Sequence, residues 1–514
     1  MHIKNWPIRD WPIRDLIERL AEGWSESHCG VAQEFLARLG TALAAHNEIT
    51  EVGDNTVFFT LNLSHIRLRG MDSKLCLLLG DANGEAGVSA LKGNSFQHQL
   101  PFVFTVTDDA HRQAVKALKG SRHLILSADD LIRLFESGDP VRVLKELLWK
   151  RVPRRALVPY SILLPAEGNM FFGRATELER LCEEEFVSFA IAGPSRIGKT
   201  SLLLQYKNQM LASRARGAHT RFYISLYNCP GRSDEYVARF IATNIESSQR
   251  SHRMTPDSLF NCLRYQQKAY GAPLELLLDE VDEVCEGRTF EMLGVAARMG
   301  LCRLILSGRG TLLRMMLSPR SPLQGRLELI QLPPLETRAA GELLLRPLLD
   351  MNFEITEADE LVKQVLSFTG RLPQLIQFIG RRFVDLALQE NTNNISVRHL
   401  EMLKDDFMSA QYFLTPLSGL DNPLTRLAAL LLLADGPRAS TISSVKDRMQ
   451  EVGVALSHQH VADICNELII NNVLSWSSGE YLVANDGLYF YARKMGFLDG
   501  ALEETLLEVN ARPL

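Results

Sequence analysis

The chain has 514 residues, of which 46% are hydrophobic and 23% charged, and a net charge of −5. This is the composition of packed globular domains, and it excludes a disordered or fibrous chain. The slightly acidic balance gives no general argument for binding to nucleic acid or to an anionic membrane. At roughly 100–200 residues per domain, the length predicts three or four domains.

The cysteines and the apolar runs bear on the compartment. Eight cysteines are scattered singly without a C-x-x-C pair, which argues against a zinc site and favours a reducing compartment. The longest leucine-rich run, 427–433, is far too short to span a bilayer. We therefore expect a cytoplasmic protein that does not enter a membrane.

The first block, residues 1–150, alternates strand-like and helix-like stretches. Helices are predicted near 13–22 and 31–47, and the block is expected to form an α/β domain. Asp72-Ser-Lys74 has the spacing of a nuclease Asp-x-Lys motif, but no second acidic residue completes it. We favour a sensor or docking domain over an enzymatic effector, and the sequence leaves both open. The predicted strands are Thr56–Leu63, Lys74–Leu79, Phe102–Val106 and Leu124–Leu126.

Two features close this block. Asp108-Asp109 and Ser127-Ala-Asp-Asp130 stand where strands pass into helices, and we expect them to cap those helices. A linker is predicted at 151–168, because the basic run Lys150-Arg-Val-Pro-Arg-Arg155 is followed by prolines. Its charges could touch phosphate or an acidic partner, but a solvated linker is the favoured interpretation.

A phosphate-binding loop follows. The apolar run 186–192 predicts a buried strand that leads into a G-x-x-x-x-G-K-[ST] sequence and then a helix, so a simple helix-capping turn is a weak alternative. The glycines let main-chain N–H groups and the helix N-terminus face an anionic phosphate. Lys199 is expected to reach the β- and γ-phosphates and Thr200 to bind Mg²⁺. The predicted nucleotide-binding residues of the loop are Gly193, Pro194, Ser195, Arg196, Ile197, Gly198, Lys199, Thr200 and Ser201.

The second half of the site is predicted where the apolar run 274–278 ends in Asp279-Glu280. A carboxylate at a buried strand tip can hold the magnesium shell, and the next one can orient and deprotonate water. Asp279 is therefore assigned to Mg²⁺ together with Thr200, and Glu280 to water activation. Solvated acids at a strand end are the alternative, which the phosphate-binding loop disfavours. Asp282 and Glu283 are expected to be solvated or linked to neighbouring loops.

A third strand, 303–306, ends in Ser307-Gly308-Arg309. Arg309 could contact the γ-phosphate and report its presence, although a surface arginine after a strand is the alternative. The predicted catalytic residues are therefore Glu280, Lys199 and Arg309. Near residue 370 a turn is predicted between helices at 358–367 and 374–388.

These motifs together resemble those of STAND-type NTPases, relatives of the AAA+ ATPases that include bacterial defence ATPases and plant disease-resistance switches. The resemblance covers about 165–405 and implies a P-loop core at 169–335 and a helical lid at 336–410. The matching segments are Phe171-Phe-Gly-Arg-Ala-Thr-Glu-Leu178, the loop from Ala190 to Leu203, Leu276-Leu-Leu-Asp-Glu280, Leu304-Ile-Leu-Ser-Gly-Arg309, Ser321-Pro-Leu323, Leu332-Pro-Pro-Leu-Glu336 and Thr369-Gly-Arg-Leu-Pro373.

The resemblance implies ATP as the nucleotide, Mg²⁺ as its metal, slow turnover, and a conformational switch with a nucleotide-dependent homo-oligomer or a protein partner. It places Gly173 and Arg174 near the base, and Pro373 of the lid against the nucleotide. The lid motif of the family often reads Thr-Gly-Gly-x-Pro, and Arg371 replaces the second glycine. No arginine finger stands out, and the candidates are Arg314, Arg320 and Arg326.

The last block, 415–500, resembles a winged helix, with a C-terminal tail at 501–514. Helices are predicted at Thr425–Leu433, Thr441–Glu451 and Ser457–Asn471, and a two-stranded wing turns at Ser478-Gly479. Such modules often read DNA with one helix in the major groove. Residues 421–500 hold six basic and nine acidic residues, a net charge of −3, whereas binding to phosphates needs the opposite sign. DNA binding is possible but disfavoured, and packing on the ATPase core or on a partner is favoured.

The expected fold class is α/β, with a P-loop core of parallel sheet and helical lid, an N-terminal α/β domain and a C-terminal winged helix. The predicted function is an ATP-gated signalling switch of the STAND type, in bacterial defence or stress signalling. Two alternatives stay open. One is a DNA-handling AAA+ ATPase such as an initiator or loader, and the other is a transcription regulator that uses the winged helix.

Overall fold

The computed structural model describes residues 12–21, 29–53, 56–63, 74–79, 102–118, 123–184, 186–212, 221–245, 254–318, 321, 323–418, 420, 422–436, 438–494 and 496–511. Its contacts divide the chain into two compact units. The first comprises Met1–Tyr160, Gly168–Met170 and Arg346–Phe353, and the second Ser161–Glu167, Phe171–Leu345 and Glu354–Leu514. Over the described ranges, none of the helices is both long and apolar enough to cross a membrane.

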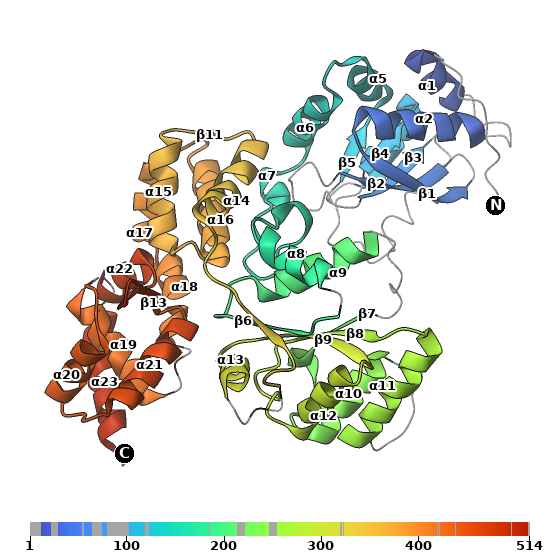
Figure 1. The fold of residues 1–514 in the computed structure, drawn as a ribbon. Helices are drawn as coiled ribbons and strands as arrows, with labels where there is room; N and C mark the ends of the chain where they lie inside the picture. The colour runs from blue at the N-terminus through green and yellow to red at the C-terminus, as the bar shows by residue number, and fades with distance from the viewer. Residues whose placement is uncertain are drawn as a thin grey trace. The chain divides into compact units, whose positions relative to one another are not determined.

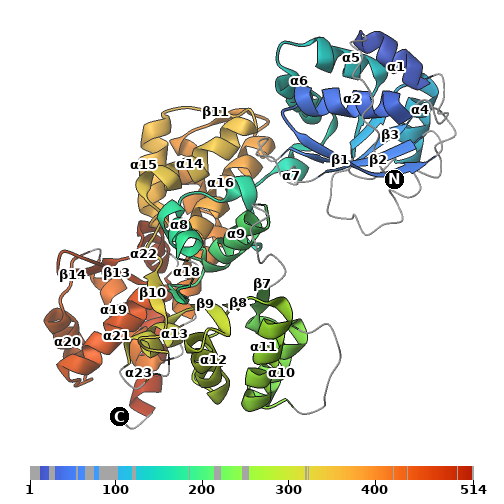
Figure 2. The same ribbon diagram turned by 45° about the vertical axis from the view of Figure 1, so that its right-hand side comes forward.

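A five-stranded mixed sheet forms the centre of the first unit (Figure 1). Its order follows the chain: β1, β2 and β3 pair antiparallel, and β3, β4 and β5 pair parallel. Val103 on β4 packs against α4, and because side chains alternate along a strand, Phe102 and Phe104 face the opposite side. There α2 lies across the sheet (Figure 2). The elements are α1 (Ile13–Ala21), α2 (Cys29–Ala42), β1 (His46–Gly53), β2 (Thr56–Asn62), β3 (Lys74–Leu79), β4 (Phe102–Thr105), α4 (Asp108–Ala117), β5 (Leu124–Leu126), α5 (Ala128–Glu136), α6 (Pro140–Arg151) and α7 (Arg154–Leu157).

The start of this unit differs from the prediction at one helix. The helix expected over 31–47 ends at Ala42, and Ala44 adopts a left-handed conformation (φ 48°) that turns the chain into the unpredicted strand β1. The predicted caps are confirmed at Ser127, which forms a capping box with Asp130 at the start of α5. Asp72 and Ser73 of the Asp-x-Lys spacing lie outside the described residues.

The solvated linker expected from residue 151 is wrong for its first ten residues. Arg151 is the last residue of α6, and α7 follows after two residues. Leu157, Val158 and Tyr160 are buried, and Arg154 lies over the Trp149 ring at 5.9 Å. The apolar residues between the basic ones drive this packing, since burying them outweighs exposing a flexible connector.

A five-stranded parallel sheet forms the core of the second unit, in the order β10-β6-β9-β8-β7. All five strands therefore end at the same edge, where ligands bind in open α/β sheets. The predicted strand from Phe186 begins only at Phe189, and Phe186 is 91% exposed. The elements are α8 (Ala175–Glu183), β6 (Phe189–Ala192), α9 (Lys199–Ala212), β7 (Arg221–Ser225), α10 (Asp234–Ile245), α11 (Pro256–Tyr270), β8 (Leu274–Asp279), α12 (Arg288–Arg298), β9 (Cys302–Gly308), α13 (Gly310–Leu317) and β10 (Glu328–Gln331).

Glu275 and Arg303 are two of the charged residues buried in this core. Glu275 on β8 accepts hydrogen bonds from Arg303 on β9 at 2.6 Å and from Tyr206 on α9 at 2.5 Å. Arg221 on β7 pairs with the other carboxylate oxygen. Arg303 also donates to the carbonyls of Val187 and Leu181. The network thus joins three strands and the helix that follows the phosphate-binding loop.

The winged helix and the helical lid, except Arg346–Phe353, complete the second unit. In the wing, Ser478 (φ 53°) and Gly479 (φ 88°) form a tight turn with both residues left-handed, as a two-residue hairpin requires. The elements are α14 (Thr337–Asp350), β11 (Glu354–Ile355), α15 (Ala358–Thr369), α16 (Pro373–Gln389), β12 (Asn394–Ile395), α17 (Val397–Lys404), α18 (Phe407–Ser418), α19 (Pro423–Asp435), α20 (Ile442–Glu451), α21 (His458–Ile470), β13 (Leu474–Ser477), β14 (Glu480–Val483), α22 (Asp486–Lys494) and α23 (Phe497–Ala511).

Most of the segment expected as a C-terminal tail is helical. Residues 501–511 belong to α23, which packs Leu502, Leu506 and Val509 on the core of the winged helix. Arg426 of α19 pairs with Glu508 at 3.3 Å. The apolar residues of this segment recur three or four positions apart, which makes one side of a helix that can be buried.

Candidate functional site

The phosphate-binding loop joins the end of β6 to the first residue of α9, Lys199. Gly198 has a φ of 102°, which a residue with a side chain rarely adopts, and Arg196 is left-handed at 68°. The loop is tied to the neighbouring strand, because the N–H of Gly193 donates to the carbonyl of Gly308 at 3.3 Å. This geometry turns the N-terminus of α9 toward the carboxyl edge of the sheet, where it can bind an anion.

Lys199 is buried within the loop, with 5% of its surface exposed. Its ammonium donates to the carbonyls of Gly193 at 3.0 Å and Pro194 at 2.9 Å. Burial lowers the pKa of Lys199, while Glu280, Asp282 and Asp279 act in the opposite direction. The cation therefore sits in a largely dry site, where its attraction to an anion is stronger than in water.

Thr200 and Asp279 meet at the end of β8. The Thr200 hydroxyl donates to Oδ2 of Asp279 at 2.7 Å, and Tyr223 of β7 donates to the same oxygen at 3.0 Å. A hydroxyl and a carboxylate oxygen are the hard ligands that Mg²⁺ prefers, and a nucleotide would complete the shell with phosphate oxygens. A cluster of three or more His, Cys, Asp or Glu side chains fit for a metal is not found among the described residues. The donor set fits Mg²⁺ held jointly with a nucleotide.

Glu280 follows Asp279 in a left-handed conformation, with φ at 57°. Its N–H donates to Oδ1 of Asp279 at 3.0 Å, which fixes the turn at the strand tip. Burial raises the pKa of Glu280, Lys199 opposes the shift and Asp279 adds to it. A carboxylate with a raised pKa next to a cation is a suitable proton acceptor near neutral pH.

Arg309 lies one residue past β9 and contacts Asp282. The backbone N–H of Arg309 donates to both carboxylate oxygens of Asp282, at 2.7 and 2.6 Å, and the side-chain Nε lies 3.7 Å from Oδ2. Asp282 is 8% exposed and Arg309 45% exposed at their side chains. Of the two interpretations for Asp282, linkage to a neighbouring loop is the one observed. Glu283 pairs with Arg232 and is more exposed.

Ser307, for which no role was predicted, is also part of this edge of the sheet. It lies on β9 between β6 and β8 and is fully buried, and its carbonyl accepts from the N–H of Val281 at 3.0 Å. Its hydroxyl has no hydrogen-bond partner among the described residues. A buried hydroxyl without a partner costs stability, so Ser307, at the edge next to Glu280, is a candidate for a functional role. The only sequence signal is a serine at the end of an apolar strand.

The segment before α8 lies against the loop and the start of the lid. Arg174 donates to the carbonyls of Ile197, at 3.4 Å, and of Pro333. Gly173 is left-handed (φ 70°), and a Cβ there would lie 3.0 Å from the side chain of Ala339. Arg174 thus contacts the phosphate-binding loop, whereas the proximity of Gly173 and Arg174 to a base stays a prediction.

Pro373 begins α16, one residue after a turn that is anchored to the core. The carbonyl of Arg371, whose φ is 58°, accepts from the N–H of Leu335 at 3.1 Å. This left-handed conformation is one that glycine adopts more readily than arginine. A direct contact between Pro373 and the loop is not among the described interactions.

Two residues of the phosphate-binding loop contact the lid and the winged helix. Arg196 lies over the Tyr412 ring of α18 at 5.1 Å, and Tyr412 stacks on Phe378 of α16 at 4.3 Å. Asn472, after α21, directs its amide to the carbonyl of Ser195 at 3.5 Å, a long hydrogen bond. These contacts were not predicted, because nothing in the spacing of the motifs relates residue 196 to residue 412.

The winged helix packs more closely on the lid than on the phosphate-binding loop. A Cβ at Gly370 would lie 2.4 Å from the carbonyl oxygen of Ala484, and one at Gly487 would lie 2.3 Å from the Phe413 ring. Ser367 of the lid also donates to Asp486 of α22. On its other side, α21 and the wing border a groove of about 1100 Å³ whose far wall is α13 and β10 of the core. The helix that would read DNA thus faces the nucleotide-binding core.

Comparisons with known proteins give distant likenesses. No protein-family model and no curated protein matches the chain. Among solved structures, a Walker-type ATPase of Pyrococcus abyssi shares 17% identity at a TM-score of 0.49, over 64% of this chain and 99% of its own. The ORC2 protein of Aeropyrum pernix shares 13% at 0.44, over 65% and 92%. The RuvB Holliday junction branch migration motor of Thermotoga maritima shares 16% at 0.36, over 63% and 96%. At these identities and scores the likenesses say nothing of substrate or partner.

Proposed function

We propose that this chain is an ATP-binding switch of the STAND type that hydrolyses ATP slowly and changes conformation with the nucleotide. The observation that carries the proposal is the cluster of Lys199, Thr200, Asp279 and Glu280 at the carboxyl edge of one parallel sheet. A cation, a hydroxyl–carboxylate pair and a carboxylate with a raised pKa are the groups that phosphoryl transfer to water needs.

Each residue of the cluster has a role in the proposed reaction. Lys199 exchanges its bonds to the loop carbonyls for oxygens of the β- and γ-phosphates, and the N–H groups at the start of α9 face the same anion. Mg²⁺, held by Thr200 and Asp279, would supply positive charge to the phosphate oxygens. Glu280 orients a water molecule and accepts its proton as the oxygen bonds to the γ-phosphorus and the bond to the leaving ADP breaks. Ser307 offers its hydroxyl to the γ-phosphate or to that water.

Arg309 has a more limited role in this proposal. Its guanidinium is paired with Asp282, so it can reach the γ-phosphate only by leaving that carboxylate. We place it as a residue that responds to the γ-phosphate and not as part of the hydrolytic centre.

The switch is supported by the two contacts that the loop makes outside the core. Arg196 touches Tyr412 of α18, which stacks on Phe378 of the lid, and Ser195 touches the winged helix through Asn472. Because these residues stand between Gly193 and Lys199, a nucleotide bound to the loop acts on both contacts. The lid and winged helix share close packing at Gly370 and Gly487, so we infer that they respond together. A nucleotide moves such an equilibrium only by its difference in affinity for the two forms.

A role in bacterial defence or stress signalling rests on the family resemblance alone. DNA handling is the less favoured function, since the winged helix is acidic and its third helix borders the groove toward the core.

The proposal is tested by single-turnover hydrolysis of ATP with Mg²⁺ by the wild type, Lys199→Ala, Glu280→Gln and the control Glu286→Gln. Glu286 is exposed in the turn that follows Glu280. Its substitution by glutamine makes the same change of charge and removes no group from the cluster. We expect slow turnover in the wild type and the control, and loss of about 100-fold or more in the two others, with ATP binding kept in Glu280→Gln. Equal rates in wild type and Glu280→Gln would refute the assignment, and fast turnover stimulated by DNA would favour the DNA-handling ATPase.

A further inference from the structure

A small hollow of about 270 Å³ in the first unit is lined by side chains from three segments. His111 and Val115 come from α4, His123 and Ile125 from β5 and the residue before it, and Arg151 from the end of α6. Three of these five side chains can carry a positive charge. None of the five belongs to the proposed nucleotide site.

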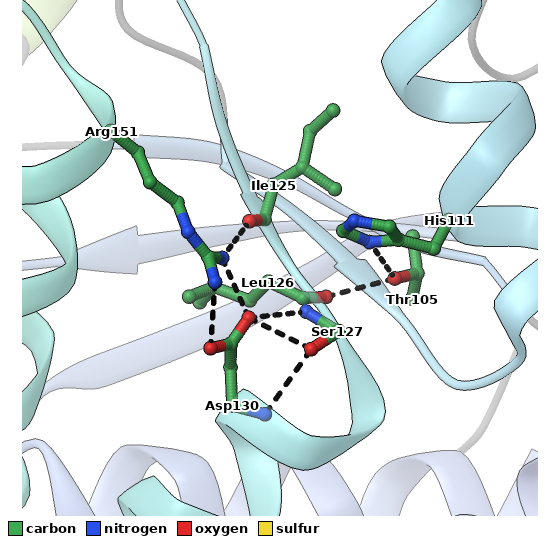
Figure 3. A network of polar contacts seen from close by, with 7 residues as sticks. All are labelled: Thr105, His111, Ile125, Leu126, Ser127, Asp130 and Arg151. Atoms are coloured by element: carbon green, nitrogen blue, oxygen red, sulfur yellow. Dashed lines mark hydrogen bonds and ion pairs between the residues drawn. The ribbon is translucent and has the colours of Figure 1, made fainter.

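Arg151 presents its guanidinium in a fixed orientation. Nη2 and Nη1 donate to the two oxygens of Asp130 at 2.8 and 2.6 Å, and Nη1 also donates to the Ile125 carbonyl at 2.6 Å (Figure 3). Asp130 is held in turn by the N–H and hydroxyl of Ser127, at 2.8 and 2.9 Å. Burial alone would raise the pKa of Asp130, but these hydrogen bonds outweigh it and keep the pKa below its ordinary value. A guanidinium has five N–H donors and these bonds use three, which leaves Nε–H and one hydrogen of Nη2 to donate elsewhere.

His111 presents a defined ring nitrogen. Thr105 is fully buried at the end of β4 and donates its single hydroxyl hydrogen to the Leu126 carbonyl at 2.9 Å. The same hydroxyl oxygen lies 3.1 Å from Nδ1 of His111, so it accepts there and Nδ1 carries a hydrogen. In the neutral ring, Nε2 is then a bare acceptor. Figure 3 shows this nitrogen directed away from Thr105, toward the side of Ile125 and Arg151.

These groups complement a phosphate that still carries a proton. The N–H groups of Arg151 donate to phosphate oxygens, and Nε2 of His111 accepts from P–OH. Near neutral pH a minor fraction of a phosphate monoester still carries that proton, because its second pKa is about 6, whereas sulfate and carboxylate carry almost none. Val115 and Ile125 add an apolar wall for a small substituent. At about 270 Å³ the hollow lies below the range of about 300–1,000 Å³ for drug-sized ligands, so a whole nucleotide would not fit.

We propose that this hollow binds a small phosphate monoester, with Arg151 and His111 as the contacting groups and Thr105 and Asp130 as the residues that position them. The first unit would then act as the sensor of a small phosphorylated molecule. This site stands independently of the nucleotide site in the second unit.

The test is calorimetric titration of the full chain, at neutral pH, with phenyl phosphate and with phenyl sulfate. Saturating ADP and Mg²⁺ keep the probes from the phosphate-binding loop. We expect one site for phenyl phosphate, with phenyl sulfate weaker by at least about tenfold, because it cannot donate to Nε2. No binding of phenyl phosphate at millimolar concentration, or equal binding of the two probes, would overturn the proposal.

Two variants distinguish the residue that contacts the phosphate from the residue that positions it. His111→Phe removes the ring nitrogens and leaves the Arg151–Asp130 pair in place, and we expect at least about a tenfold loss for phenyl phosphate. Thr105→Val keeps the shape of the side chain but removes the hydroxyl that fixes the tautomer of His111. The ratio of the affinities for phenyl phosphate and phenyl sulfate should therefore fall. The control is Arg142→Gln, at the exposed start of α6. Thermal unfolding shows whether each variant is folded, and equal phenyl phosphate affinity in wild type and folded His111→Phe would contradict the site.

Discussion

Thr200 donates a 2.7 Å hydrogen bond to Asp279, a residue 79 positions further along the chain. The bond joins the first turn of α9 to the tip of β8, and Tyr223 of β7 steadies the same carboxylate oxygen at 3.0 Å. The hydroxyl and the carboxylate are therefore assembled by the protein itself, at the place where the proposal requires the ligands of Mg²⁺. Pre-assembly of this kind lowers the cost of ordering the site when nucleotide and metal bind.

Thr200→Val should remove the benefit that Mg²⁺ gives to ATP binding. The substitution keeps the shape of the side chain and deletes the hydroxyl, so we expect the gain in affinity on adding Mg²⁺ to fall by at least about tenfold. Affinity in EDTA should stay the same, since the loop N–H groups and Lys199 are unchanged. Thr200→Ser keeps the hydroxyl and serves as the control. A Mg²⁺-dependent gain that survives in Thr200→Val would show that this pair does not hold the metal.

The rate of hydrolysis should follow the ionisation of Glu280. Burial raises the pKa of this carboxyl group, and a general base must be ionised, so kcat/KM should fall on the acid side with a midpoint above the ordinary pKa of a glutamate. Glu280→Gln should lose this acid limb together with most of the rate. The measurement is the pH profile of kcat/KM for both proteins. An acid limb that is unchanged in Glu280→Gln would assign the titration to another group.

The same shift has a consequence for stability. The folded state binds the Glu280 proton more tightly than the unfolded state does. The contribution of Glu280 to the free energy of unfolding is therefore present below its pKa in the unfolded chain, and it is lost as pH rises through its pKa in the folded protein. Glu280→Gln should therefore unfold at a higher temperature than the wild type at neutral pH, and the difference should shrink toward acid pH. Thermal unfolding at neutral and acid pH measures it. A variant less stable than the wild type at neutral pH would contradict the sign.

Ser307→Ala should separate activity from stability. The hydroxyl is buried without a partner among the described residues, so removing it should leave the unfolding temperature unchanged or raise it. If the hydroxyl contacts the γ-phosphate or the attacking water, kcat should fall by about tenfold while ADP affinity is kept. Single-turnover rates and thermal unfolding of the same preparation give both values. A variant with wild-type kcat would leave the hydroxyl without a role in hydrolysis.

Variants of the buried network of Glu275, Arg303 and Arg221 should differ in stability according to the charges that each substitution leaves unpaired. Glu275→Leu leaves two buried guanidinium groups without their carboxylate, whereas Arg303→Met leaves Glu275 still paired with Arg221. Breaking such a pair costs about 3–5 kcal/mol, and we expect Glu275→Leu at the upper end and Arg303→Met at the lower end. Denaturant unfolding measures the order. The control is Arg338→Met, an exposed partner of Glu342 whose loss should cost at most about 1 kcal/mol. The reverse order would mean that the carboxylate is not the centre of the network.

The sequence located the phosphate-binding loop and the acidic strand tip because both are set by local rules. Gly198 must adopt a conformation that residues with a side chain avoid, and the apolar run before Asp279 can only be a buried strand next to such a loop. The loop and the buried strand together predict a parallel sheet, with a strand before the loop and a helix after it. These features depend on neighbours within a few residues and were therefore predictable.

What the sequence did not reveal depends on side chains that meet across long separations. One prediction was that Arg309 could contact the γ-phosphate, with a surface arginine as the alternative, and nothing in the spacing indicated its pairing with Asp282, 27 positions away. The stacking of Arg196 on Tyr412 joins residues more than two hundred positions apart. The linker was misjudged for another reason, since charged residues at the surface of a helix look like those of a solvated segment. Burial of the apolar residues between them decided the outcome.

The central claim is that ATP and ADP hold this chain in different forms, and sedimentation velocity of Glu280→Gln tests it most directly. The variant is measured with Mg²⁺ and ATP and with Mg²⁺ and ADP, after a displacement assay has shown that both nucleotides are bound. The account predicts different sedimentation coefficients, with a larger assembly or an altered shape in ATP, and no difference in Lys199→Ala. Identical sedimentation of Glu280→Gln in the two saturating nucleotides would contradict the switch.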